Sequence, residues 1–164
     1  MMPANPQGAI TLRVPAGTGE VAFCFYGMEF ARRTRDGIVF GLGKSFERLK
    51  PENESRLRKL TQDLDLYRSP LATDTDHRLF RAEPERWLEA VILTGPTKLD
   101  AMLDPNHFSS QVPALAGGDR GVLHLLDSTR QGRLVVIELK ASEDIQMPLQ
   151  AVDYWLRGAA PLAR

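Results

Sequence analysis

The sequence contains few of the residues from which disulfides and zinc sites are built. Cys24 is its single cysteine, so an intramolecular disulfide is excluded. The three histidines lie far apart along the chain and do not combine with Cys24 into a zinc-ligand pattern. The sequence therefore does not indicate a small domain that depends on disulfides or zinc for its stability.

Long apolar runs and an excess of one charge are missing as well. No apolar stretch approaches the roughly 18 residues that a membrane-spanning helix needs, and no basic segment with an apolar run behind it marks a secretory signal. Lys and Arg number 21, as do Asp and Glu, which argues against a strongly basic nucleic-acid-binding protein. We therefore expect a cytoplasmic protein. A phosphate-handling enzyme remains compatible with this composition if a metal ion supplies positive charge.

The residues that are present are typical of a folded protein. Hydrophobic residues make up 43% and charged residues 26% of the 164 positions, enough to form a core. Alternating and β-branched stretches predict a small antiparallel β unit in the first part of the chain. Its expected strands are residues 9–14, 21–26, 28–34 and 38–40.

A long helix is predicted to follow, from Pro51 to about Tyr67, with a core-facing stripe at Leu57, Leu60 and Leu64. The preceding Gly-Leu-Gly-Lys-Ser stretch, residues 41–45, resembles the end of a phosphate-binding loop. The required first glycine is absent, since the position holds isoleucine, so a plain turn is expected.

The polar residues 71–83 indicate a linker between two parts. We therefore expect residues 1–83 to form an N-terminal β-rich subdomain with one long helix, and residues 84–164 to form a second domain. In the second part the sequence predicts a helix over 84–93, strands over 108–112, 121–127 and 133–140, and a helix over 148–157. The whole chain is thus expected to be an α/β (α+β) protein.

Two charged residues interrupt the last predicted strand, which is otherwise apolar. Glu138 and Lys140 are two residues apart, so their side chains project to the same face. Burial of such charges is costly unless they are paired or bind an ion. A plain salt bridge at the end of a strand and a reactive site are equally compatible with these two residues.

The turn before this strand decides which residue faces Glu138. A three-residue loop, 130–132, with Gly132 in the left-handed conformation would place His124 opposite Glu138. A two-residue loop would instead place Leu125 there and bring Asp127 to that face. The position of the glycine favours the first register, in which His124, Glu138 and Lys140 converge.

The last predicted helix carries Gln150 and Tyr154 four residues apart, and hence on one face. An amide and a phenol in this place could steady a phosphodiester or a water molecule. The alternative is that Leu149, Val152 and Trp155 pack while Gln150 points to solvent, and the residues alone leave both open.

The order of these features resembles the PD-(D/E)XK nuclease superfamily, in particular its RecB-like and NucS-like branches. The stretches that carry the resemblance are PERWLEAVI, GGDRGVLHLLDSTRQGRLVVIELKA and PLQAVDYW, all within residues 84–157. Residues 1–83 have no part in it. The resemblance implies a restriction-endonuclease-like mixed sheet flanked by helices in the C-terminal half.

The resemblance also implies metal-dependent hydrolysis of DNA, with Mg²⁺ or Mn²⁺ held by carboxylates. Glu138 would be a metal ligand and Lys140 would orient the attacking water. The first-helix acid would be Glu85 or Glu89. The supporting residues of the last helix would be Gln150 and Tyr154. The expected partner is nucleic acid, DNA rather than RNA, with no membrane, and a homo-oligomer is left open.

Two departures from the family pattern affect activity. His124 stands where the family has Asp in a Gly-x-x-Asp-Leu-Leu context, and neutral imidazole is a poor ligand for Mg²⁺ but acceptable for softer ions. Asp119, or Asp127 after a register shift, could substitute, and a packed His124 without a ligand role is the alternative. Only residues 158–164 follow the last helix, so we expect the core to lack its last strand. The alternative function is a catalytically degenerate nuclease-fold module in nucleic-acid binding or protein assembly.

Overall fold

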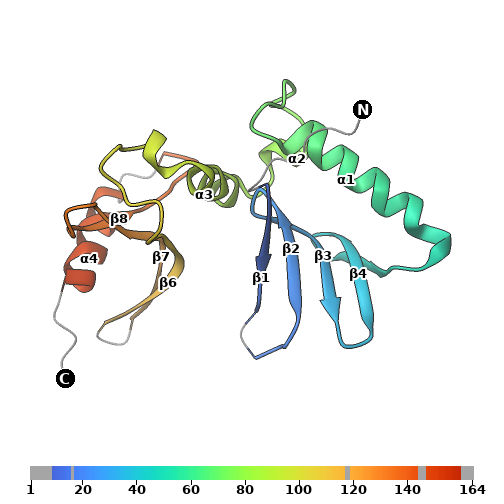
Figure 1. The fold of residues 1–164 in the computed structure, drawn as a ribbon, viewed down its shortest axis with the longest axis horizontal. Helices are drawn as coiled ribbons and strands as arrows, with labels where there is room; N and C mark the ends of the chain where they lie inside the picture. Colours follow the sequence, from blue (N-terminus) through green and yellow to red (C-terminus); the bar gives the residue numbers. More distant parts are fainter. Residues whose placement is uncertain (1–8, 16, 117–118, 144–146, 160–164) are drawn as a thin grey trace. The chain divides into compact units, whose positions relative to one another are not determined.

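The computed structural model describes residues 9–15, 17–116, 119–143 and 147–159. The chain forms two compact units, Met1–Val91 and Ile92–Arg164 (Figure 1). Both units combine an antiparallel sheet with helices, so the mixed α+β class expected from the sequence is confirmed. The division lies inside helix α3 (Pro84–Thr94), further along the chain than the boundary suggested by the polar segment.

A five-stranded meander forms the sheet of the first unit, with each strand antiparallel to the next in sequence order. The strands are β1 (Ile10–Arg13), β2 (Val21–Phe25), β3 (Met28–Thr34), β4 (Gly37–Leu42) and β5 (Ser45–Arg48). Strand β5 was not predicted. The segment that resembles a phosphate loop is the β4–β5 hairpin turn, in which Leu42 pairs with Ser45, so the expectation of a plain turn is confirmed.

Helix α1 (Glu54–Arg68) follows a short 3₁₀ turn, η1 (Pro51–Asn53), and supplies one side of the first core. Leu64 is fully buried, and Leu57 and Leu60 pack against the same cluster, as their spacing predicted. The sheet and its β2–β3 turn contribute the buried aromatic members of this core, which are Phe25, Tyr26, Phe30 and Phe40.

The linker interpretation of residues 71–83 is wrong, because part of this segment packs into the first unit. Residues Arg78–Arg81 form the short helix α2, and Leu79 is a buried member of the core. The ring of His77, which precedes α2, stacks on Tyr67 with 3.8 Å between ring centroids. Leu79 and the stacked pair thus help to anchor an otherwise polar segment to the first unit.

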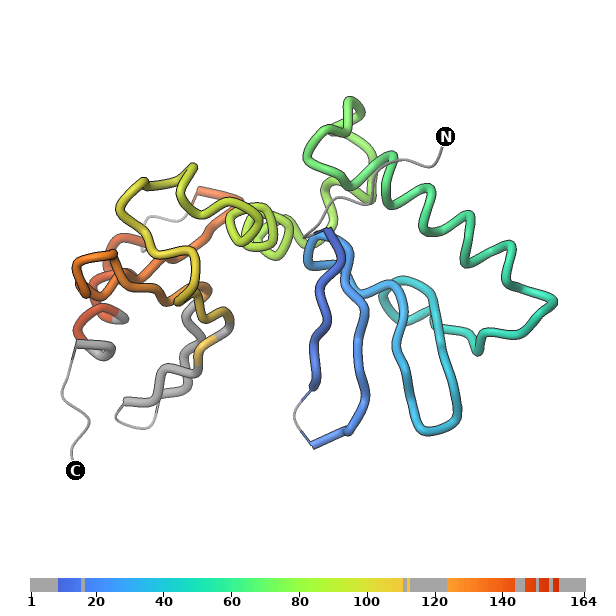
Figure 2. Tube along the Cα trace, in the orientation of Figure 1, coloured from blue at the N-terminus to red at the C-terminus, as the bar shows by residue number. Residues whose placement is uncertain are grey.

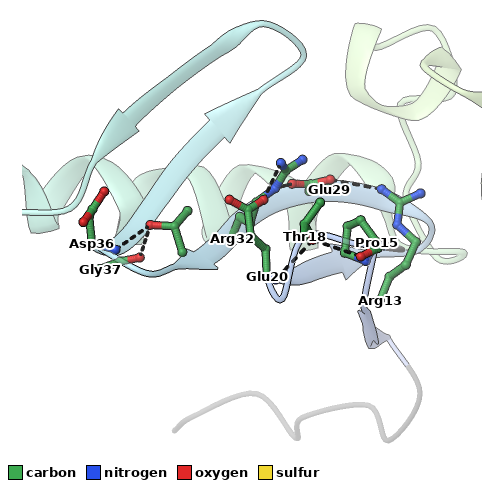
Figure 3. A network of polar contacts seen from close by, with 9 residues as sticks. Arg13, Pro15, Thr18, Glu20, Glu29, Arg32, Asp36 and Gly37 are labelled. Carbon is green, nitrogen blue, oxygen red and sulfur yellow. Dashed lines mark hydrogen bonds and ion pairs between the residues drawn. The ribbon is translucent and has the colours of Figure 1, made fainter.

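A chain of ion pairs crosses the first three strands (Figure 3). Glu29 of β3 accepts hydrogen bonds from Arg13 at 3.0 Å and from Arg32 at 2.7 Å, and Arg32 also contacts Glu20 at 3.0 Å. Burial alone would raise the pKa of Glu29, but the hydrogen bonds and charges of Arg32 and Arg13 outweigh it and hold the pKa below its usual value. The basic residues of this face therefore have acidic partners of their own.

The second unit contains a three-stranded sheet in the order β6-β7-β8, with β7 in the centre. Figure 2 traces the backbone of both units, coloured from blue at the N-terminus to red at the C-terminus. Its elements are the 3₁₀ turn η2 (Pro96–Lys98), β6 (Ser109–Ala116), β7 (Asp119–Ser128), β8 (Leu134–Ile137) and α4 (Met147–Ala159). Helix α4 contacts both outer strands.

The described strands of this unit all pair antiparallel, whereas a mixed sheet was expected. The reason is that short connections join neighbouring strands, and a parallel pair needs a crossover of a dozen or more residues. Within the described parts of both units, none of the helices has the length and apolar character needed to cross a membrane.

Candidate functional site

The β7–β8 hairpin has the register that places His124 opposite Glu138. Leu125 pairs with Ile137 and Ser128 with Leu134, and one further step along this ladder aligns His124 with Glu138. The turn has Gly132 at φ +78°, and the backbone N–H of Gly132 donates to the carbonyl of Thr129 at 2.8 Å. The register predicted from the three-residue turn is therefore confirmed.

Three polar side chains converge at the end of β8. The ring Nδ1 of His124 lies 2.9 Å from Oε2 of Glu138, and Nζ of Lys140 lies 3.6 Å from Oε1 of the same carboxylate. The side chains of His124, Glu138 and Lys140 are 17%, 3% and 22% exposed. A nearly inaccessible carboxylate thus has one oxygen toward an imidazole and the other toward an ammonium group.

Glu138 and Lys140 lie just beyond the end of β8, in a segment without regular secondary structure. β8 stops at Ile137, so Glu138 and Lys140 follow the last regular pair and do not belong to the strand as predicted. The backbone N–H of Leu139 then points to Nδ1 of His124 at 3.4 Å instead of to a carbonyl of β7. Sequence reasoning missed this contact, because no residue type identifies a backbone donor.

Asp127 cannot replace His124 in this register. It lies three residues from His124 along β7 and pairs with Val135, so its side chain belongs to the opposite face of the sheet from Glu138. Asp127 is 3% exposed, and neither of its carboxylate oxygens has a hydrogen-bond partner among the described residues. The proposed substitution of Asp127 after a register shift is therefore wrong.

The remaining predicted site residues are placed by their backbone only, or in the other unit. Asp119 begins β7, and Gln150 and Tyr154 lie in α4, but their side chains are outside the described residues. Glu85 and Glu89 lie in the part of α3 that belongs to the first unit, where Glu89 is buried. The grouping of these five residues with Glu138 stays a prediction.

The described side chains do not complete a metal centre by themselves. Among them there is no group of three or more His, Cys, Asp or Glu positioned to hold an ion. Glu138 and His124 provide a pair of donor atoms.

Comparisons of the chain with protein-family models, with curated proteins and with solved structures found no match. The resemblance of the C-terminal half to PD-(D/E)XK nucleases therefore rests on the sequence alone and stays a prediction.

Proposed function

We propose that this chain is a metal-dependent nuclease that hydrolyses phosphodiester bonds of DNA in the cytoplasm, with Mg²⁺ or Mn²⁺ as its cofactor. The observation that carries the proposal is the buried Glu138 carboxylate with Lys140 and His124 on either side of it. A buried carboxylate is costly unless positive charge balances it. Charged groups retained at such a cost are a common property of active sites.

Each side chain has a distinct task in this proposal. Glu138 would hold the cation through a hard oxygen, for which Oε2 is suited because it is buried and has no hydrogen-bond partner among the described residues. Lys140 orients the attacking water and balances charge on the phosphate. The bound cation would lower the pKa of a water molecule and neutralise charge that develops on the phosphorus centre. A further ligand is proposed from Asp119, which begins β7 of the same unit.

The α4 residues Gln150 and Tyr154 have a supporting task. Both lie in one helix four residues apart, so their Cβ atoms are on the same side of it. We assign them to steadying the phosphodiester next to Lys140, as the resemblance implies.

Supercoiled plasmid is a suitable first substrate, because one cut converts it to a relaxed form that a gel separates. We expect nicking that requires Mg²⁺ or Mn²⁺ and falls at least about 100-fold in Lys140→Ala, the loss typical of a group that stabilises developing charge. Lys98→Ala is the matched control, since Lys98 is an exposed lysine of the same unit, and it should cut like the wild type. Cleavage that is indifferent to Lys140 would refute the assigned mechanism. Single-stranded DNA and RNA of one sequence then define the substrate.

A second candidate function is a nuclease-fold module that binds nucleic acid or another protein without cutting. The observation that favours it is the imidazole of His124 at the position where the family has a carboxylate. His124→Asp separates the two. If the wild type does not cleave DNA and this variant does, the site of the wild type is a decayed nuclease site. If neither protein cleaves DNA although both are folded, nuclease function is refuted.

A further inference from the structure

Strand β1 is an open edge of the five-stranded sheet in the first unit (Figure 1). Apolar side chains alternate along it and just past its end, where Ile10, Leu12 and Val14 are 47%, 65% and 66% exposed. Among the described residues, no strand pairs with the outer side of β1. A strand edge with exposed apolar side chains is a template for pairing with another strand.

The other edge of this sheet is protected against such pairing. β5 contains Glu47 and Arg48, and Lys50 follows it, so charged side chains disfavour the approach of another strand there. In β1 the one charged residue is Arg13, and its guanidinium forms an ion pair with Glu29 at 3.0 Å. The two edges therefore differ in their chemistry, and β1 is the one suited to association.

The backbone of β1 directs a defined set of groups away from the sheet. Tyr26 donates its N–H to the carbonyl of Ala9 at 2.9 Å. Hydrogen-bonded pairs alternate along an antiparallel ladder, so Thr11 is the next residue that bonds to β2. Ile10 and Leu12 occupy the positions in between, and their N–H and C=O groups consequently point away from β2.

A second copy of β1 matches these groups and the side chains in one antiparallel register. With Leu12 opposite its own copy on a twofold axis, Ile10 lies opposite Val14. These three are alternate residues, so their outward N–H and C=O groups coincide and every such pair exchanges hydrogen bonds. Arg13 then lies opposite Thr11, whereas centring the axis on Arg13 would oppose two arginines. Centring it on Thr11 would leave Val14 without an apolar partner.

The same register extends the first core across the axis. Ile10 and Leu12 pair with Phe25 and Phe23 of β2 and share their face, and both phenylalanines belong to the core or pack against it. We infer that β1 is a dimerisation surface, through which two copies of this chain join their sheets into one continuous antiparallel sheet. This inference concerns the first unit and does not depend on the proposed nuclease function.

Sedimentation equilibrium up to millimolar chain concentration measures the association, because an interface of one short strand per copy is small and its dimer weak. We expect a reversible monomer–dimer equilibrium. Leu12→Lys should raise its dissociation constant at least about tenfold, because it brings two ammonium groups together at the twofold axis. Leu66→Lys is the matched control, since Leu66 is 62% exposed in α1, away from this edge, and this variant should associate like the wild type. Leu12→Pro removes an N–H that the chain's own sheet does not use, so a folded chain with this substitution should be monomeric.

Oxidative cross-linking tests the register. Leu12→Cys places two thiols at one pair with Cα atoms about 5.5 Å apart, within the reach of a disulfide, and Cys24 is buried. In Ile10→Cys the two thiols are offset by four residues, about 14 Å, and should not bond. A wild type that is monomeric at every concentration would overturn the inference and leave the edge to a strand of another protein. A dimer that both Leu12 variants leave intact, or equal cross-linking of the two cysteine variants, would also overturn it.

Discussion

The first unit is predicted to depend on one arginine that is completely buried. Arg68, the last residue of α1, is 0% exposed and makes five hydrogen bonds to backbone carbonyls. Nε and Nη2 donate to the Phe25–Tyr26 turn, and Nη1 donates to Leu79 at 2.8 Å and to Ala82 at 2.6 Å. The guanidinium thus connects the sheet, α1 and the segment after α2 at a single point.

Removing the Arg68 side chain is costly because its carbonyl partners lose their hydrogen-bond donors and the buried space it fills becomes empty. Burial disfavours the charged form and lowers the pKa of Arg68 to about 10, against a smaller opposite effect of Glu83, so the side chain is charged at neutral pH. Arg68→Ala leaves four carbonyls without their donors and opens a cavity. Each buried acceptor left unsatisfied costs about 1–3 kcal/mol, so we expect a total loss of at least about 3–5 kcal/mol. A domain with a total stability of about 5–15 kcal/mol would lose a large part of it.

Urea unfolding followed by far-ultraviolet circular dichroism measures this loss. Arg58→Ala is the control, because Arg58 lies in the same helix, is 71% exposed and forms a surface ion pair with Glu54. Its removal should change the free energy of unfolding by less than about 0.5 kcal/mol. Arg68→Lys should fall between the two, since one ammonium group cannot reproduce the fork of donors. If Arg68→Ala and Arg58→Ala lose equal stability, the reasoning is refuted.

Two further predictions concern the sheet of the first unit. Glu29→Gln should lower the free energy of unfolding by about 1 kcal/mol at pH 7, because it removes the charge that Arg13 and Arg32 contact. The pKa of Glu29 is lowered by folding, so this difference should be constant above pH 4.5 and disappear as the pH falls through the depressed value, and a difference unchanged at low pH would contradict it. Gly27→Ala should cost about 3 kcal/mol, because a methyl group at φ +79° would also overlap a backbone oxygen of α3. Gly43→Ala, at φ +60° with open space around it, should cost only the strain of about 1–2 kcal/mol, and equal losses in thermal melts would show that the overlap is relieved.

Local signals account for the parts of the structure that the sequence could predict. The β7–β8 register depends on a turn of a few residues and on Gly132, so the chemistry of the turn was sufficient to place His124 opposite Glu138. The stripe of α1 was predictable for the same reason, since its spacing is a property of the helix itself.

The parts that could not be predicted depend on contacts between distant segments. Arg68 is an ordinary helix residue in the sequence, and its partners are backbone carbonyls that no side chain identifies. Leu79 is a single apolar residue in a polar segment, without any period to mark it, yet it is buried in the core. The backbone N–H of Leu139 after β8 likewise donates to a ring contributed by the neighbouring strand.

The candidate site depends on register more than on any one of its side chains. Alternate residues of a strand face opposite sides, so a slip of one residue between β7 and β8 would replace His124 by an apolar neighbour opposite Glu138. The buried carboxylate would then lose its imidazole while keeping the cost of burial. Both candidate functions, the active nuclease and the module that binds without cutting, therefore require the same turn at Gly132. They differ only in the role of the His124 imidazole. Cleavage by the wild type and by His124→Asp is consequently the measurement that separates the two functions most directly.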